Sequence, residues 1–366
     1  MMKKQLYKLM IITFVLAPIG LIANSGKMKG KYTKEKTVKK EYTVNADALL
    51  RIHNKYGNLN VSSWDENRVV IEVTIKVNGN NEEKVIQKLN NITIDFDDSS
   101  NMVSAETIFK SSKSGWNWGW GNKSNVNMQI DYNIKVPIKN SIHLNNDYGN
   151  IILDRIDGHA KISCDYGRLE IGALRGRNNK LSFNYTKNST FGYIESAYIN
   201  ADYSGYTIEK AGNLEINADY TNSTVLEMDN LSYVSDYGKL IVEKVNNVQG
   251  NGDYTNIKLG VVHGNLDVSA SYGSLKINEM AEDAGNVEIR TDYTGVKIGY
   301  HPSYFFNFEI QAEYSGVGGK ENFNINISRE KSSQRYYKGF YGKENSGNNV
   351  SINSEYGGIA FHKIDS

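Results

Sequence analysis

A tyrosine in a fixed local setting recurs along the chain, and it constrains the fold more than any other feature. An acidic residue precedes it and Gly, Ser or Thr follows it at Tyr148, Tyr166, Tyr203, Tyr220, Tyr237, Tyr254, Tyr293, Tyr314 and Tyr356. Tyr185 and Tyr272, which follow Asn184 and Ser271, fill the two gaps in this series. A recurrence at a nearly fixed period indicates a repeat architecture.

The repeat spacing is 17 to 21 residues up to Tyr314, and then 42 residues to Tyr356. We interpret the last step as two periods, in which one repeat has lost its tyrosine or gained a loop. Tyr56, in the segment KYGNLNV, has the same pattern but lies 92 residues before Tyr148.

Apolar residues alternate with polar ones on both sides of the tyrosine. Leu214, Ile216 and Ala218 precede Tyr220 at every second position, and the same alternation resumes three residues after most of the tyrosines. After Tyr185 and Tyr220 it appears one residue later. Such alternation is typical of strands with one buried face.

The length of the repeat selects the architecture. A strand–helix–strand unit needs about 30 residues, which is more than one repeat supplies. Two or three short strands with tight turns fit, and successive repeats would stack at roughly 4.8 Å. We therefore predict an all-β protein, a parallel β-solenoid (β-helix) of roughly 17–21-residue coils. Its aligned tyrosines would stack as a ladder.

The single cysteine, Cys164, lies two residues before Tyr166, where other repeats carry a small residue. A disulfide within the chain is therefore excluded. We interpret Cys164 as a small inward-facing residue and not as a reactive thiol.

The first residues predict export. Lys3, Lys4 and Lys8 precede an apolar run that ends at the small residues Ala23 and Ser25, as in a secretory signal peptide of residues 1–25. The mature chain then has no transmembrane span. Its formal charge falls from +1 to about −2 with the loss of three lysines, which argues against binding nucleic acid.

Residues 26–140 predict a β-rich N-terminal head that caps one solenoid edge. We expect one short helix at Glu82–Leu89 and strands at Val69–Val77, Ile92–Phe96, Met102–Phe109 and Val126–Val136. Lys27–Lys40 reads as a solvated tail. The solenoid would occupy residues 141–366, with an insertion at about 329–347 that forms a surface loop or folds over the C-terminal end.

The chain resembles the putative-adhesin families of bacterial envelope proteins, including those with a head GIN domain. The resemblance rests on the leader, the segments LLRIHNKYGNLNV and YNIKVPIKNSIHLNNDYGNIIL, and the DYG or DYT repeats. It implies a β-solenoid on or near the cell surface and supplies no catalytic residues.

Two sets of residues are candidates for binding. Acids before the tyrosines would form one column, with Asp202, Asp219, Asp236 and Asp253 as weak calcium candidates, although exposed turn residues explain them better. Exposed aromatic side chains mark contact surfaces. The candidates of this kind are Trp116, Trp118, Trp120, Tyr336, Tyr337, Phe340 and Tyr341. The alternative for the three tryptophans is that their rings fold back on the head or cap the solenoid.

The sequence carries no catalytic or cofactor signature, because its six histidines are scattered and no phosphate-binding or nucleophile motif occurs. We expect a non-catalytic envelope protein, an adhesin or scaffold, in the periplasm, on the outer membrane or outside the cell. Its partner would be a surface glycan or a protein. A carbohydrate-active β-helix enzyme (polysaccharide lyase or hydrolase) and a periplasmic regulatory or assembly factor remain as alternatives.

Overall fold

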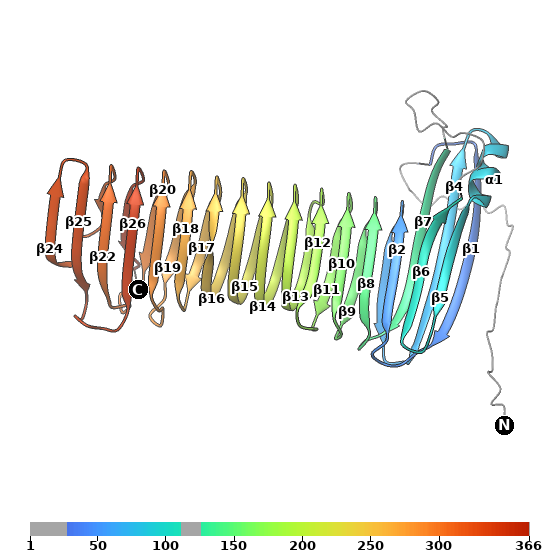
Figure 1. Ribbon diagram of the computed structural model, residues 1–366, viewed down its shortest axis with the longest axis horizontal. Helices are drawn as coiled ribbons and strands as arrows, with labels where there is room; N and C mark the ends of the chain where they lie inside the picture. Colours follow the sequence, from blue (N-terminus) through green and yellow to red (C-terminus); the bar gives the residue numbers. More distant parts are fainter. Residues whose placement is uncertain (1–27, 111–125, 366) are drawn as a thin grey trace. The chain divides into compact units, whose positions relative to one another are not determined.

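A computed structural model describes residues 28–110 and 126–365. Within these ranges the protein is nearly all-β, with a long, mostly parallel sheet that is not closed and one helix, α1 (Glu82–Asn90) (Figure 1). No helix in the described part is long and apolar enough to span a membrane. The predicted signal peptide lies outside the described residues.

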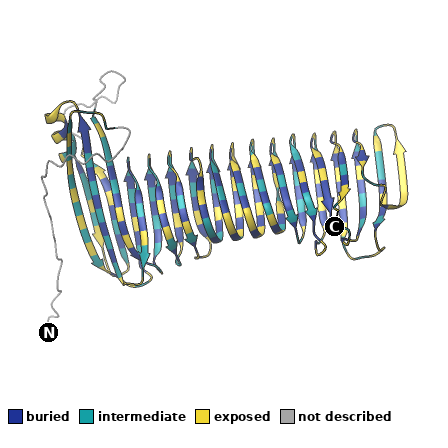
Figure 2. Ribbon diagram, turned by 180° about the vertical axis from the view of Figure 1, so that it is seen from behind, coloured by how far each residue is buried: buried dark blue, intermediate teal, exposed yellow. Residues whose placement is uncertain are grey.

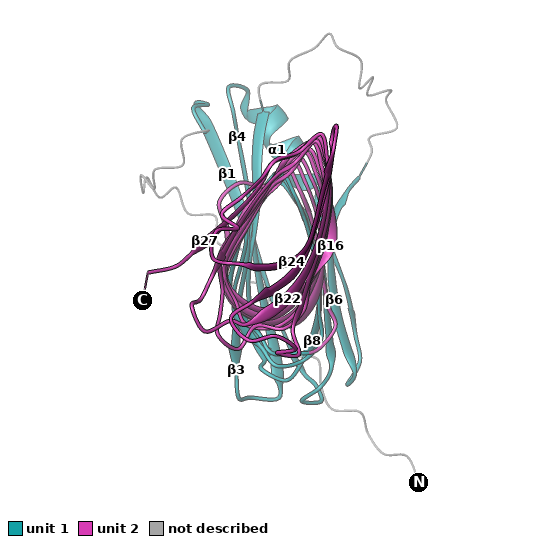
Figure 3. Cartoon of the chain, turned by 90° about the vertical axis from the view of Figure 1, so that its left-hand side faces the viewer, with its two compact units in different colours: residues 1–176 teal, residues 177–366 magenta. Residues whose placement is uncertain are grey.

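The chain divides into two compact units, Met1–Gly176 and Arg177–Ser366 (Figure 3). The predicted boundary between head and solenoid at residue 140 is a different division and stays a prediction.

In the second unit, four long strands each fill the interval between two repeat tyrosines. They pair side by side in parallel, and each residue lies opposite the residue 17 positions later, as in Tyr206–Ser223–Leu240. These strands are β13 (Ser189–Asp202), β14 (Gly205–Asp219), β15 (Asn222–Asp236) and β16 (Lys239–Asp253).

Shorter strands continue the parallel pairing on both sides of these four. They are β12 (Asn179–Asn184), β17 (Asn256–Val262), β18 (Leu266–Ser271), β19 (Ser274–Met280), β20 (Val287–Asp292) and β21 (Gly295–Tyr300).

The predicted alternation is confirmed by the alternating burial along the strands (Figure 2). Leu214, Ile216 and Ala218 are all buried. The offset expected after Tyr220 is wrong, because a buried serine, Ser223, takes the inward position that an apolar residue holds in other repeats.

Each repeat tyrosine has a left-handed backbone, with φ between 48° and 66° at all twelve positions including Tyr56. This conformation costs an L-residue roughly 1–2 kcal/mol. A backbone hydrogen bond holds this conformation. The tyrosine N–H donates to the backbone carbonyl of the residue before the next tyrosine, at 2.9 Å from Tyr220 to Asp236 and 3.0 Å from Tyr237 to Asp253.

The rings of these tyrosines stack face to face. In the second unit, successive ring centroids lie 4.6–5.1 Å apart and the ring planes differ by at most 8°. Each of these tyrosines is still about half exposed. Stacking of this kind contributes about 0.5–1.5 kcal/mol per pair beyond burial.

The repeat tyrosine and the residue after it form the turn between two strands, which we call the corner of the repeat. The residue after the tyrosine packs against backbone carbonyls at this turn. The Thr221 hydroxyl donates to the carbonyls of Asp219 and Ala201, both at 2.9 Å. Where this residue is Gly238, an added Cβ would lie 2.2 Å from the carbonyl oxygen of Thr221. Glycine is therefore required where a Cβ would meet a carbonyl oxygen, and Ser or Thr is found where its hydroxyl bonds to backbone carbonyls.

The last repeat of the sequence does not lie last in the sheet. β26 (Asn349–Glu355) pairs in parallel with β20 on one side and with β22 (Phe306–Glu313) on the other. The ring of Tyr356 accordingly lies between those of Tyr293 and Tyr314, at 4.6 Å and 4.8 Å. The 42-residue step is therefore not two successive repeats. Of our two alternatives, the lost tyrosine is wrong, whereas the gained segment is present as the hairpin of residues 324–341. β27 (Ile359–Lys363) similarly pairs with β21 and β23 (Val317–Gly318).

The insertion expected near residues 329–347 is a β-hairpin. β25 (Gln334–Tyr341) runs antiparallel to β22, and the exposed β24 (Asn324–Lys331) runs antiparallel to β25. Phe323, which precedes the hairpin, packs against the rings of Phe306 and Tyr341. The hairpin therefore ends the parallel pairing at β22 with antiparallel strands.

In the first unit, the repeat at Tyr56 joins the tyrosine series in space. Its strands, β2 (Leu49–Lys55) and β3 (Leu59–Trp64), pair in parallel with β8 (Ser141–Asp147) and β9 (Ile151–Ile156), and the ring of Tyr56 stacks on Tyr148 at 5.3 Å. β10 (Ala160–Asp165) and β11 (Leu169–Leu174) extend this pairing by one more repeat.

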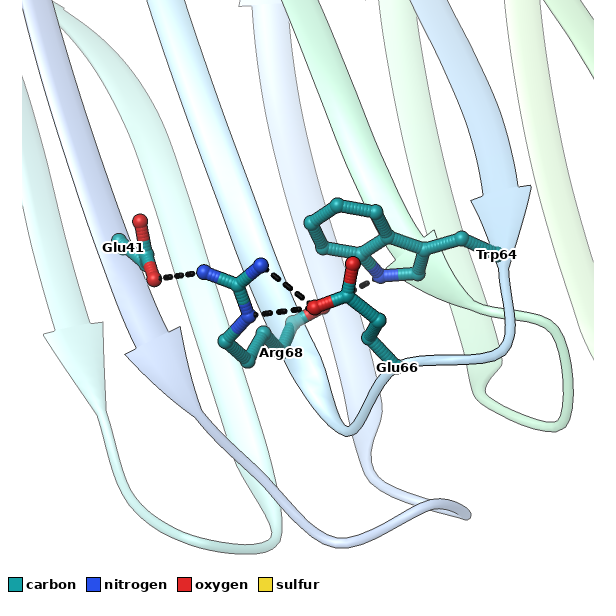
Figure 4. Close-up of polar contacts among 4 residues, drawn as sticks. All are labelled: Glu41, Trp64, Glu66 and Arg68. Carbon is teal, nitrogen blue, oxygen red and sulfur yellow. Dashed lines mark hydrogen bonds and ion pairs between the residues drawn. The ribbon is translucent and has the colours of Figure 1, made fainter.

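The 92-residue interval forms strands that lie beside β2 and β3. The expected helix and strands are confirmed as α1, β4 (Arg68–Gly79), β5 (Ile92–Asp98), β6 (Met102–Phe109) and β7 (Val126–Pro137). β6 pairs with β2, and β7 pairs with β3 and β4. At the turn into β4, Arg68 binds Glu66 and also Glu41, while the Trp64 indole donates to the Arg68 carbonyl at 2.8 Å (Figure 4).

The expected solvated tail at Lys27–Lys40 is wrong. Residues Tyr32–Thr43 form β1, which pairs with β4 in antiparallel register over its whole length. Lysines occupy half-buried positions of this strand, which hid its alternation. The Lys36 ammonium donates to the carbonyls of Leu89, in the last turn of α1, and Ile92, the first residue of β5, at 2.8 and 2.6 Å. A positive charge at this end of α1 is favourable for the helix dipole.

The two roles of the repeat tyrosine, in stacking and in the left-handed turn, predict the relative stabilities of three substitutions at Tyr237. Tyr237→Ala removes two stacking contacts and keeps the left-handed backbone, so we expect it to be the least stable variant, by about 1–3 kcal/mol. Tyr237→Gly should be less destabilised than Tyr237→Ala by about 1 kcal/mol, because glycine adopts this conformation freely. Tyr237→Phe keeps the stack and should unfold close to the parent. Urea unfolding followed by circular dichroism measures all three, and an Ala variant as stable as the parent would contradict the stacking account.

Candidate functional site

The acidic column predicted from the sequence exists. Asp202, Asp219, Asp236 and Asp253 lie opposite one another in the parallel register. Burial raises the pKa of Asp236, and the neighbouring carboxylates of Asp219 and Asp253 raise it further. The Asp253 N–H, which donates to Asp236 Oδ1 at 3.3 Å, opposes this effect.

Nothing in the geometry of this column assembles a complete cation site. In residues 28–110 and 126–365, no group of three or more His, Cys, Asp or Glu side chains lies close enough together to hold a metal ion. Calcium normally takes six to eight oxygen ligands. The calcium role of the four aspartates stays a prediction.

The aromatic candidates fall into two sets. Trp116, Trp118 and Trp120 lie outside the described residues. On β25, Tyr337 and Tyr341 are buried, whereas Tyr336 and Phe340 are half-buried. The contact role predicted for this segment is untested, and it would fall on the two half-buried residues.

The buried tyrosines of β25 use their hydroxyls within the fold. The Tyr341 hydroxyl donates to the Pro302 carbonyl at 3.0 Å, and the Tyr337 hydroxyl binds Glu330 and the Lys320 ammonium. These bonds satisfy polar groups that would otherwise be buried without partners.

Cys164 occupies the small inward position that the sequence predicted, and its side chain is buried. Burial raises the pKa of the Cys164 thiol to about 12, with smaller contributions from Asp165 and Asp147. The thiol therefore stays protonated at neutral pH and lacks the nucleophilicity of a thiolate.

A second column, which our sequence reasoning missed, runs along the second unit. It lies seven residues before the repeat tyrosines, where asparagine occurs in every repeat of this unit but the one with Ser196. Its members are Asn178, Asn213, Asn230, Asn247, Asn265, Asn286, Asn307 and Asn349. The alignment of apolar positions did not reveal it, because it is a polar and outward-facing position.

Hydrogen bonds link the asparagines from repeat to repeat. The Asn230 amide donates to Asn213 at 2.7 Å, and the Asn247 amide donates to Asn230 at 2.8 Å. Further along, the side-chain oxygen of Asn247 accepts from the Asn265 backbone at 2.9 Å. The Asn265 and Asn286 oxygens accept equivalent backbone bonds from the following repeats. The column is therefore an ordered amide ladder.

A groove of about 900 Å³ lies along this ladder. One side is the amide ladder, and the other is the row two residues later along each strand. That row consists of Lys180, Tyr198, Glu215, Ser232, Gln249, Asp267, Glu288 and Ser351. Buried residues such as Leu214, Leu231 and Val248 lie between the two rows. The groove therefore has polar sides above an apolar core.

Comparison with known proteins gives distant structural likenesses. No family model matches the chain, and no curated protein sequence does. A "putative cell adhesion protein" from Clostridium sporogenes is 15% identical over 91% of this chain and 100% of its own, with a TM-score of 0.21. A "putative adhesin" from Parabacteroides merdae is 9% identical over 89% and 96%, with a TM-score of 0.32.

A "putative lipid binding protein" from Parabacteroides distasonis is 10% identical over 90% of this chain and 97% of its own, with a TM-score of 0.27. Likenesses at these identities and TM-scores carry no argument about function.

The acidic column generates a pH prediction. Because the pKa of Asp236 is raised in the folded protein, its stabilising contribution is present below the unfolded-state pKa near 4 and is lost as pH rises through the folded-state pKa. Asp236→Asn should therefore raise the unfolding midpoint at pH 7, and this difference should shrink as pH falls toward 3. Thermal unfolding between pH 3 and pH 7 measures it.

The matched control is Asp229→Asn, which removes the same charge from the same strand outside the column and should not raise the midpoint at pH 7. A second arm adds calcium at pH 7. Stabilisation of the parent by calcium that is absent in Asp236→Asn would instead assign the column as a cation site.

Proposed function

We propose that this chain is an exported, non-catalytic protein of the cell envelope, an adhesin or scaffold built on a parallel β-solenoid. The observation that carries the proposal is the in-register parallel pairing of successive repeats. This pairing turns each outward position of the repeat into a row of side chains on the surface.

The solenoid interpretation is supported by the strand pairing. From β14 to β18, strands of successive repeats pair in parallel, with partners 17 or 18 residues apart. A repeat this short buries its apolar side only when neighbouring repeats lie next to it. The head of residues 26–140 would protect one end, since β6 and β7 pair with the strands of the Tyr56 repeat.

A binding or structural role is supported by the regularity of the surface. Enzymes place different groups, such as a nucleophile, an acid and an orienting residue, at one irregular point. Here the acids before the tyrosines, the tyrosines themselves and the asparagines are each repeated in rows. Such rows suit an extended partner, a surface glycan or a protein, which makes the same contact several times.

Export is supported by the basic and apolar leader at residues 1–25. The test is protease treatment of intact cells of the bacterium that carries the protein, with a periplasmic marker as control. We expect a mature chain without residues 1–25 in the envelope fraction.

Digestion of this chain while the marker survives would place it on the surface as an adhesin. Protection until the outer membrane is opened would select a periplasmic scaffold. A chain that keeps residues 1–25 and fractionates with the cytoplasm would contradict the proposal.

A further inference from the structure

The groove along the amide ladder has the properties of a binding site for an extended ligand. It is lined by residues from eight successive repeats, from Asn178 to Ser351. With strands spaced roughly 4.8 Å apart, its length is on the order of 35 Å. The two polar rows are two residues apart along each strand, which separates them by roughly 6.6 Å. These proportions fit a narrow linear polymer and not a compact ligand.

The amide ladder offers hydrogen bonds that are already oriented. An asparagine side chain has two N–H donors and two acceptor lone pairs. Asn230 uses one donor toward Asn213 and one lone pair toward Asn247, which leaves one of each for a ligand. Because the ladder already orders these side chains, a ligand would lose little of their conformational entropy on binding.

The opposite row adds hydroxyl, amide and carboxylate groups, which are the partners that sugar hydroxyls need. In this row, the side chains of Glu215, Ser232 and Gln249 are exposed. Of the described residues that line the groove, Tyr198 is the aromatic one, and its side chain is 39% exposed. Its ring can pack against the apolar face of a sugar at the Asn178 end.

The charge of the groove argues for a neutral ligand. Asp267 and Glu288 both form ion pairs with Arg290, and Lys180 and Glu215 have opposite signs. Together with Arg290, the charged side chains of the groove comprise two cations and three carboxylates. This balance does not attract an anionic polymer. The repeat tyrosines do not provide a comparable sugar platform, because their ring faces cover one another.

We propose that this groove binds an extended, neutral polysaccharide, held lengthwise between the amide ladder and the row containing Glu215 and Gln249. This inference rests on the proposed function and names its ligand class and site.

The experiment is isothermal titration of the purified mature chain with neutral hexasaccharides of glucose, mannose and galactose, and with an anionic hexasaccharide of galacturonic acid. We expect at least one neutral hexasaccharide to bind more tightly than its own disaccharide and more tightly than the anionic one. The double variant Glu215→Ala/Gln249→Ala leaves the amide ladder intact and should weaken binding by about tenfold.

The control Asn222→Ala/Lys239→Ala removes one amide and one charge from β15 and β16 outside the groove, and it should bind like the parent. Circular dichroism establishes that both variants are folded. The inference is overturned if no neutral hexasaccharide binds, or if the groove variant binds as tightly as the control. It is also overturned if a protein, and no oligosaccharide, occupies the groove.

The outcomes separate this inference from the proposed function. Binding by the purified chain does not depend on export, so an exported chain that binds no sugar contradicts the groove assignment alone. Release of shorter oligosaccharides during the titration would contradict the non-catalytic function and support the groove as the sugar site.

Discussion

The structure depends on the left-handed tyrosine corner. At this point the chain turns from one strand into the next, in a conformation that is unfavourable for any residue with a side chain. Two interactions offset that cost. One is the hydrogen bond from the tyrosine N–H to a backbone carbonyl of the next repeat, and the other is the stacking of the tyrosine ring on its neighbours. Both require the adjacent repeat, so the corner couples local backbone geometry to the pairing of whole repeats. The alternating core and the outward rows follow from the register that this corner sets.

The alternation of apolar residues was sufficient to predict the strands and the inward position of Cys164, because burial acts residue by residue along a strand. Alternation was also sufficient for β4 to β7, and the helical spacing of residues 82–89 was sufficient for α1. Burial alone does not specify which strand lies next to which. The position of Tyr356 between Tyr293 and Tyr314 therefore could not be inferred from order in the sequence. The missed strand β1 carries lysines on its half-buried side, where their long apolar stems can cover a surface that alternation normally assigns to valine or isoleucine.

In the candidate site, too, one part could be predicted from the sequence and another could not. The acidic column was predictable because it adjoins a tyrosine that is easy to align. The amide ladder was overlooked, although its position seven residues before the tyrosine is nearly constant, because asparagine in a β-rich chain is readily attributed to turns. Only the parallel register shows that Asn213, Asn230 and Asn247 are neighbours in space, and that the row beside them completes a groove. Repetition that stabilises the fold therefore also arranges the chemistry on its surface.

Hydrogen exchange at the tyrosine amides tests the central role of the corner most directly. Tyr203, Tyr220, Tyr237 and Tyr254 lie at turns and their side chains are about half exposed, so a simple turn would exchange its amide hydrogens rapidly. The account predicts that these four amides are protected as strongly as those of the buried strand residues beside them, because each N–H bonds to the next repeat. Rapid exchange at these amides, with protected strands on either side, would show that the corners follow the pairing of the repeats and do not hold it.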